Sequence, residues 1–78
     1  MKITAFGITR DILGCRELVL EKKNAGSVRE LRDYLLAKYP EIGRLKSLAI
    51  AVNQQYASDD EALSEDSEIV LIPPVSGG

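Results

Sequence analysis

The C-terminal segment Pro73-Pro74-Val75-Ser76-Gly77-Gly78 holds the residues of this sequence that are best suited to chemistry. Gly77 and Gly78 carry no Cβ, so the terminal carboxylate can pass through a narrow channel and approach other groups closely. Pro73 and Pro74 favour an extended base for this tail. Six extended residues reach at most roughly 20 Å, which is enough to enter the cleft of another protein. The pattern predicts a flexible tail at 73–78 that presents the Gly78 carboxylate to a partner.

The rest of the chain lacks the residue sets that common active sites require. Among its 78 residues there is no His, and Cys15 is the sole cysteine. Ser-His-Asp and Cys-His arrangements are therefore excluded within this chain, as are the common zinc sites. The acidic residues of 58–67 lack the spacing and central glycine of an EF-hand loop, which favours a solvated acidic loop. We expect no bound metal, no bound cofactor and no catalysis by this chain alone.

Composition narrows the partners and the compartment. The net charge of -2 and the sequence pI near 5.0 argue against nucleic acid and against an anionic membrane surface. A single cysteine cannot form an internal disulfide, which favours a reducing compartment and a small, partly buried role for Cys15. The N-terminal residues lack the apolar run and cleavage site of a signal peptide. We therefore expect a cytoplasmic protein that binds another protein.

One main helix and four or five strands are predicted to position the tail. The helix is the clearest element, because Ser27 and Glu30 match a capping box and Pro40 supplies a stop. One apolar stripe follows at helical spacing: Val28, Leu31, Leu35 and Tyr39. The predicted elements are strands at 2–8, 16–21, 48–52, 56–57 and 68–72, a helix at 28–38, a turn or short helical piece at 9–14, a turn at 53–55, and a loop at 58–67 that Leu63 pins to the core.

This order predicts an α+β protein of the β-grasp class. A mixed sheet covered on one face by one helix accommodates it, with the first and last strands paired in parallel at the centre. Residues 1–72 then form a single domain, and residues 73–78 form the tail. No internal repeat or second domain is visible.

The face of the sheet that the helix leaves open is predicted to be partly apolar. If Ile69 and Leu71 face the helix, Phe6, Val70 and Ile72 lie on the opposite face. Two interpretations stay open for these three side chains. Loops could cover them as a secondary cluster, or they could form a docking patch for a protein beside the root of the tail.

The sequence resembles a known family from end to end. Its ending, Ile72 to Gly78, closely matches that of the small subunit of molybdopterin synthase, the ubiquitin-like sulfur carrier of molybdenum-cofactor biosynthesis. Further matches in family order are Arg10-Asp11-Ile12-Leu13-Gly14, Val28-x-x-Leu31, Tyr39-Pro40, Ala51-Val52-Asn53-Gln54 and Leu63-x-x-x-x-Glu68-Ile69. Leu71 and Ile72 stand where the family often has aromatic residues, so packing against a partner could differ in detail.

The resemblance implies a sulfur-carrying role for Gly78. An E1-like activating enzyme would consume ATP to adenylate its carboxylate, and a sulfur donor protein would convert the adenylate to a thiocarboxylate. The tail would then enter the large synthase subunit and give its sulfur to a cyclic pyranopterin precursor, in a heterotetramer of two carriers and two large subunits. By position, Phe6, Arg10, Tyr56 and Ile72 match family contacts to the large subunit, and Val70 joins them on the open face.

Three other functions fit parts of the sequence. A sulfur carrier of the thiamine pathway shares the fold and the Gly-Gly end, although that family is usually shorter and lacks a counterpart of residues 10–14. A ubiquitin-like modifier joined to lysines through Gly78 would begin with the same adenylate. A plain interaction domain with an inert tail is the fourth interpretation.

Overall fold

The computed structural model describes residues 1–45 and 47–74 as five strands, two α-helices and two short 3₁₀ helices. Among these residues no helix combines the length and the apolarity that crossing a membrane requires. In chain order the elements are β1 (Lys2–Ala5), α1 (Gly7–Leu13), β2 (Glu17–Val19), η1 (Lys22–Asn24), α2 (Val28–Lys38), η2 (Pro40–Arg44), β3 (Ala49–Val52), β4 (Gln55–Tyr56) and β5 (Glu68–Ile72).

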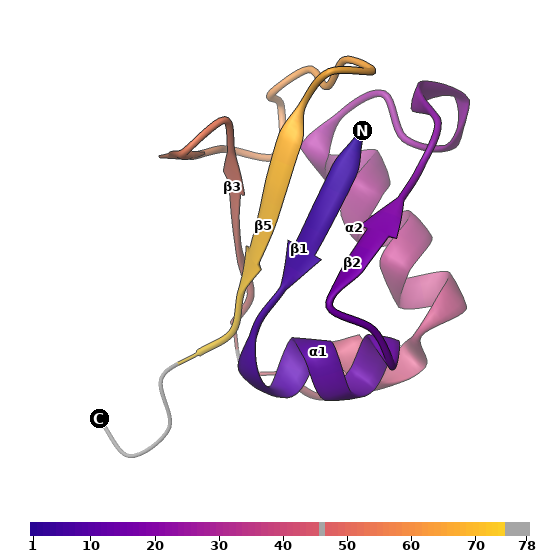
Figure 1. Cartoon of the computed structure of the whole chain (residues 1–78), viewed down its shortest axis with the longest axis vertical. Coiled ribbons are helices and arrows are strands. Elements are labelled where there is room, and N and C mark those ends of the chain that lie inside the picture. The colour runs from indigo at the N-terminus through magenta and orange to yellow at the C-terminus, as the bar shows by residue number, and fades with distance from the viewer. Residues whose placement is uncertain (46, 75–78) are drawn as a thin grey trace.

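The strands form one mixed sheet in the order β2-β1-β5-β3-β4. The central strands β1 and β5 pair in parallel, and every other neighbouring pair is antiparallel. Helix α2 lies behind this sheet, while α1 lies across the end at which β1 and β5 finish (Figure 1). The predicted β-grasp class and the parallel central pair are confirmed. The sheet therefore has one face on α2 and one face turned away from it.

Helix α2 spans the predicted residues because local signals fix both of its ends. The Ser27 hydroxyl oxygen accepts a hydrogen bond from the Glu30 N–H at 3.2 Å. Glu30 reaches back as predicted, but its carboxylate accepts from the Gly26 N–H at 2.8 Å and not from Ser27 itself. At the other end Pro40, which disfavours helix at the residue before it, begins the separate turn η2.

The acidic segment of residues 58–67 contacts α2 but keeps most of its carboxylates in solvent, as predicted: Asp60, Glu61, Glu65 and Asp66 are exposed, and Asp59 is half-buried. Leu63 is buried, as predicted. Asp59 pairs with Arg32 at 2.9 Å, and Asp60 lies 3.6 Å from Arg29. The carbonyls of Asp59 and Glu61 accept hydrogen bonds from two N–H groups of the first turn of α2. The loop therefore satisfies backbone donors that a helix cannot satisfy internally.

The first strand is shorter than predicted. The sequence predicted a strand at 2–8, whereas β1 ends at Ala5 and Ile8 belongs to α1. The predicted helical piece at 9–14 is present but begins two residues earlier. The backbone turns at Gly7, whose φ of 55° lies in the left-handed region that glycine adopts without a steric penalty. Thr9 then caps the first turn, because its hydroxyl oxygen accepts a hydrogen bond from the Phe6 N–H at 3.1 Å.

Candidate functional site

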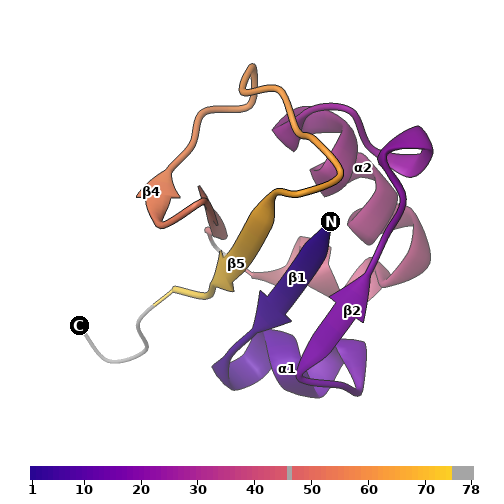
Figure 2. The same cartoon turned by 45° about the horizontal axis from the view of Figure 1, so that its top comes forward.

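The candidate site begins where β5 ends and the chain leaves the sheet. Leu71 is paired on both sides, with Ala5 of β1 and with Ile50 of β3, and Ile72 is paired with Ala49. Pro73 follows and has no N–H to continue a ladder of hydrogen bonds. Figures 1 and 2 both show the chain leaving at the end of the sheet that also carries α1. The sheet thus releases the tail at a defined point.

The tail itself is only partly described. Pro73 and Pro74 are half-buried against the domain. The other predicted tail residues, Val75, Ser76, Gly77 and Gly78, lie outside the described residues. The boundary between a domain at 1–72 and a flexible tail at 73–78 therefore stays a prediction, as does the role of Gly78.

An apolar patch borders this exit. It consists of Phe6, Tyr56, Val70 and Ile72, and we call it the root patch. Register places Val70 between Thr4 and Ala51, and Tyr56 lies opposite Ala51. Val70, Ile72 and Tyr56 therefore share the open face of the sheet, and Phe6 follows directly after β1.

Loops do not cover the whole root patch. The Phe6 side chain is 54% exposed and the Tyr56 side chain 76% exposed, whereas Val70 and Ile72 are half-buried. Of the two interpretations, a covered secondary cluster is thus excluded for Phe6. Because exposed aromatic side chains beside half-buried aliphatic ones are typical of protein interfaces, the docking interpretation is favoured.

The other half of the open face is polar. The Lys2 ammonium donates to the Glu17 carboxylate at 2.7 Å, and this hydrogen bond raises the pKa of Lys2 above its ordinary value. Glu68 lies beside Lys2 in the parallel ladder and adds to the same effect. The open face therefore carries charges at the start of β1 and β5 and on the outer strand β2. We call this region the charged half, although it also includes the exposed Val19.

Arg10 is exposed on α1, outside the root patch. It lines a shallow hollow of about 270 Å³ together with Asp11, Gly14, Cys15 and Arg16. Its guanidinium makes no salt bridge with any described residue. The structure thus leaves Arg10 accessible to a partner, and its predicted contact stays a prediction.

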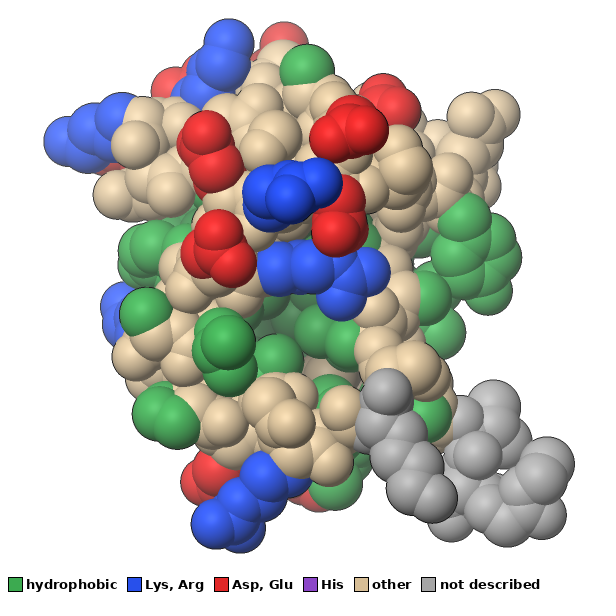
Figure 3. Space-filling view, turned by 180° about the vertical axis from the view of Figure 1, so that it is seen from behind, with side chains coloured by type: hydrophobic (Ala, Val, Ile, Leu, Met, Phe, Trp, Pro, Cys, Tyr) green, Lys and Arg blue, Asp and Glu red, His purple; other side chains and the backbone are tan. Residues whose placement is uncertain are grey.

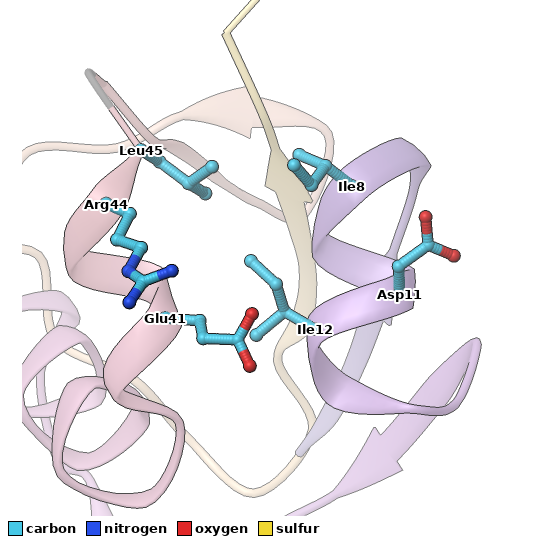
Figure 4. Close-up of a pocket in the computed structure, with 6 residues that line it drawn as sticks. All are labelled: Ile8, Asp11, Ile12, Glu41, Arg44 and Leu45. Carbon is cyan, nitrogen blue, oxygen red and sulfur yellow. The ribbon is translucent and has the colours of Figure 1, made fainter.

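Sequence reasoning missed a groove between α1 and η2. Ile8, Ile12 and Leu45 point into this groove of about 420 Å³, and Glu41 and Arg44 extend from η2 at its edge (Figure 4). Ile8 is 50% exposed and was predicted to lie on a strand, so its helical position was overlooked. The spacing of Ile8 and Ile12, four residues apart, is the helical signal that could have indicated it.

A third hollow adjoins this groove, since Leu45 lines both. Figure 3 shows apolar side chains at its base beneath a group of Lys, Arg, Asp and Glu side chains. It measures about 360 Å³ and includes Leu36, Ile42, Leu45 and Leu48 in its lining. Arg32, which also lines this hollow, forms a salt bridge with Asp59 at 2.9 Å. Leu48 of its lining directly precedes Ala49, the residue of β3 that pairs with Ile72 of the root patch.

Two further features of the described residues concern metal binding and the pairing of buried polar atoms. Within residues 1–45 and 47–74 no group of three His, Cys, Asp or Glu side chains could hold a metal ion. Every buried side-chain nitrogen or oxygen in that part of the chain has a hydrogen-bond partner.

Comparison with known proteins gives the family. Residues 3–78 match the ThiS family. The molybdopterin synthase sulfur carrier subunit of Caenorhabditis briggsae is 37% identical over all of this chain and 96% of its own length. The subunit of the same name from Arabidopsis thaliana is 28% identical over all of this chain and 82% of its length.

Solved structures agree with the fold. The putative molybdopterin converting factor subunit 1 of Pyrococcus furiosus superposes with a TM-score of 0.84 at 25% identity, over 95% of both chains. SAMP1 of Haloferax volcanii has a TM-score of 0.82 at 24% identity, over all of this chain and 98% of its own. The predicted family is confirmed: the chain belongs to the ThiS family, and among its full-length relatives are molybdopterin synthase sulfur carrier subunits.

Proposed function

We propose that this chain is the sulfur-carrying small subunit of a molybdopterin synthase. One observation carries the proposal, namely the similarity of the whole chain to sulfur carrier subunits of that name. The geometry supports it, because the root patch borders the point at which β5 releases the tail. The tail of a carrier docked through the root patch would therefore begin at the border of the interface with the partner.

The carrier chemistry takes place on Gly78 in two steps. An activating enzyme joins the Gly78 carboxylate to the AMP portion of ATP, and pyrophosphate leaves. A donor at the oxidation level of sulfide then attacks the carbonyl carbon. A C–S bond forms, the C–O bond to AMP breaks, and AMP leaves a thiocarboxylate behind.

Delivery takes place in the large subunit. The thiocarboxylate sulfur attacks an electrophilic carbon of the cyclic pyranopterin precursor: a C–S bond forms, a C–O bond of that carbon breaks, and its oxygen leaves with a proton. Water then cleaves the bond between that sulfur and the Gly78 carbonyl carbon, which restores the carboxylate. The large subunit supplies the catalytic groups, and two carriers on two large subunits form a heterotetramer. The carrier contributes reach, a narrow end and a docking surface.

Intact mass spectrometry tests the proposal. The chain is expressed with an activating enzyme and a sulfur donor, and we expect exchange of one oxygen for sulfur, localised to Gly78 by fragmentation. The loaded protein is then mixed with the large synthase subunit or with a thiamine-pathway thiazole synthase, each with its own substrate. Transfer only in the first mixture supports the proposal. Transfer only in the second, an unchanged carboxylate, or covalent conjugates with lysines of other proteins would each contradict it.

A further inference from the structure

The junction between β1 and α1 lies level with the start of the tail. Ala5 pairs with Leu71, so Gly7 and Pro73 each lie two residues beyond the last pair of the parallel ladder. A Cβ built on Gly7 would lie 3.5 Å from the Pro73 Cγ atom, which is ordinary van der Waals contact. The chain that turns into α1 and the chain that enters the tail therefore still lie side by side here, just beyond the last pair of the ladder.

Phe6 directly follows β1. If the parallel ladder continued, Phe6 would be the next residue whose backbone bonds to the β5 chain. The Lys2 N–H donates to the Ser67 carbonyl at 3.2 Å, so Lys2 faces β5. Alternate residues of a strand bond to the same neighbour. The Phe6 N–H, four residues after Lys2, therefore points toward β5, and its donor should continue the ladder.

Thr9 takes both polar groups of Phe6 out of that ladder. The Thr9 hydroxyl accepts from the Phe6 N–H at 3.1 Å and donates to the Phe6 carbonyl. The Thr9 N–H also donates to that carbonyl, at 3.1 Å. The Thr9 side chain is fully buried, so solvent does not compete for its hydroxyl.

Pro73 completes the separation from the other side. In a parallel ladder the Thr4 carbonyl accepts from residue 71, and the Phe6 carbonyl would accept from residue 73. Residue 73 is a proline and has no N–H to give. The donor that β5 lacks at this position is thus replaced, at the Phe6 carbonyl, by the two donors of Thr9.

We propose that Thr9 and Pro73 together release the tail from the sheet, and that Thr9 is a positioning residue for sulfur transfer. This inference rests on the proposed function. Without the pair, β1 and β5 would extend their ladder and hold the first tail residue in the sheet. The tail would then be shortened by its base and its direction changed, and misplacement of a reacting group by about 1 Å can cost about 100-fold in rate.

The test restores the missing donor at residue 73. The variants are Pro73→Ala, alone and with Thr9→Val, which removes the hydroxyl but keeps the shape. Thr9→Ser with Pro73→Ala is the matched control that keeps the hydroxyl. Pro74→Ala is the second control, because in an extended chain its nitrogen points to the side opposite β1.

Hydrogen exchange of the residue 73 amide is the first measurement. We expect it to be about fivefold to tenfold slower in Thr9→Val/Pro73→Ala than in Thr9→Ser/Pro73→Ala, as one net hydrogen bond gives. Equal, unprotected exchange in both would overturn the release. This measurement needs no sulfur, so it tests the release of the tail by Thr9 and Pro73 independently of the proposed function. Failure of the wild-type chain to carry sulfur would contradict the proposed function and would leave this test valid.

Single-turnover sulfur transfer from the loaded chain to the saturating partner is the second measurement. We expect the rate constant to fall at least about tenfold in Thr9→Val/Pro73→Ala, with the dissociation constant of the partner within threefold of wild type. The matched comparison is with the Thr9→Ser counterpart, which carries the same change at residue 73 and should transfer at least about tenfold faster than Thr9→Val/Pro73→Ala. When Pro74→Ala replaces Pro73→Ala in both proteins, the same exchange of valine for serine at residue 9 should change the rate by less than about threefold. An unchanged rate despite a protected amide, or a parallel loss of affinity, would overturn the positioning role of Thr9.

Discussion

The face of the sheet on α2 and the face turned away from it share strand β5 but differ in what covers them. On the helix side the residues of the central strands β1 and β5 are almost inaccessible, at most 1% exposed: Ile3, Ala5, Ile69 and Leu71. On the open side Val70 and Ile72 are half-buried, and Phe6 and Tyr56 are exposed. Residues that alternate along β5 therefore serve different purposes. Ile69 and Leu71 stabilise the fold, whereas Val70 and Ile72 remain available for a partner.

The charged half of the open face differs from the root patch in the type of its side chains. Lys2, Glu17 and Glu68 interact there at the surface, away from the tail. Exposed ion pairs add little to stability. In this region Val19 is the exposed apolar residue, next to Lys2. The root patch is thus formed by the residues of β5 that alternate onto the open face, together with Phe6 and Tyr56.

Removal of Gly78 should give the largest functional effect and separate function from folding completely. We expect sulfur transfer to be abolished, because the activated carboxylate would then belong to Gly77 and stop short of the partner's reacting atoms. The free energy of unfolding should not change, since the paired residues of β5 end at Ile72. Transfer assays and urea denaturation on the same sample check both expectations. Transfer retained by the shortened chain would contradict the role assigned to Gly78.

Leu71→Ala should affect the helix-covered face alone. Leu71 is fully buried, and a Leu→Ala change in a core typically costs about 2–5 kcal/mol through lost transfer free energy and a residual cavity. Urea or thermal denaturation measures this cost. Partner affinity, measured at a temperature where the variant is still folded, should stay near the wild-type value. A large loss of affinity in the folded variant would show that the two faces are not independent.

Ile72→Asp should have the opposite profile. A charge in the middle of a docking surface is left desolvated and unpaired when the partner binds, which typically costs about 2 kcal/mol or more, roughly 30-fold in dissociation constant. Since Ile72 is half-buried and faces away from α2, folding should be affected less than by Leu71→Ala. Titration calorimetry with the large synthase subunit measures the affinity.

Val19→Asp is the matched control for this prediction. Val19 is 76% exposed and lies opposite Lys2 in the charged half of the open face. The same substitution there should leave partner affinity within about twofold, because surface changes away from an interface have small effects. Equal losses of affinity at both positions would mean that the partner covers the whole open face. Loss of the folded state in Ile72→Asp would place that residue in the core.

Much of the fold was predictable because its signals are local. Helix α2 was predicted at 28–38, since a capping box and a proline mark its ends. The open-face residues followed from alternation along β5. The end of β1 was not predictable in the same way. Thr9 resembles any polar residue in sequence, and only its burial against Phe6 makes it a cap. The role of Ile8 was missed for the same reason.

Glu17→Gln should give the smallest effect and tests the charged half of the open face. The Glu17 carboxylate raises the pKa of Lys2, so the charged form of Lys2 is favoured in the folded protein. The stability from this pair is therefore fully present below the ordinary Lys2 pKa of 10.5 and is lost as the pH rises through the higher folded value. Wild type should be slightly more stable than Glu17→Gln at pH 7 and low salt. The difference should shrink with added salt and disappear once Lys2 is deprotonated.

Urea denaturation of wild type and Glu17→Gln across this pH range measures the difference in stability. A difference that persists in the most alkaline samples would mean that Glu17 stabilises the sheet by a contact other than the one with Lys2.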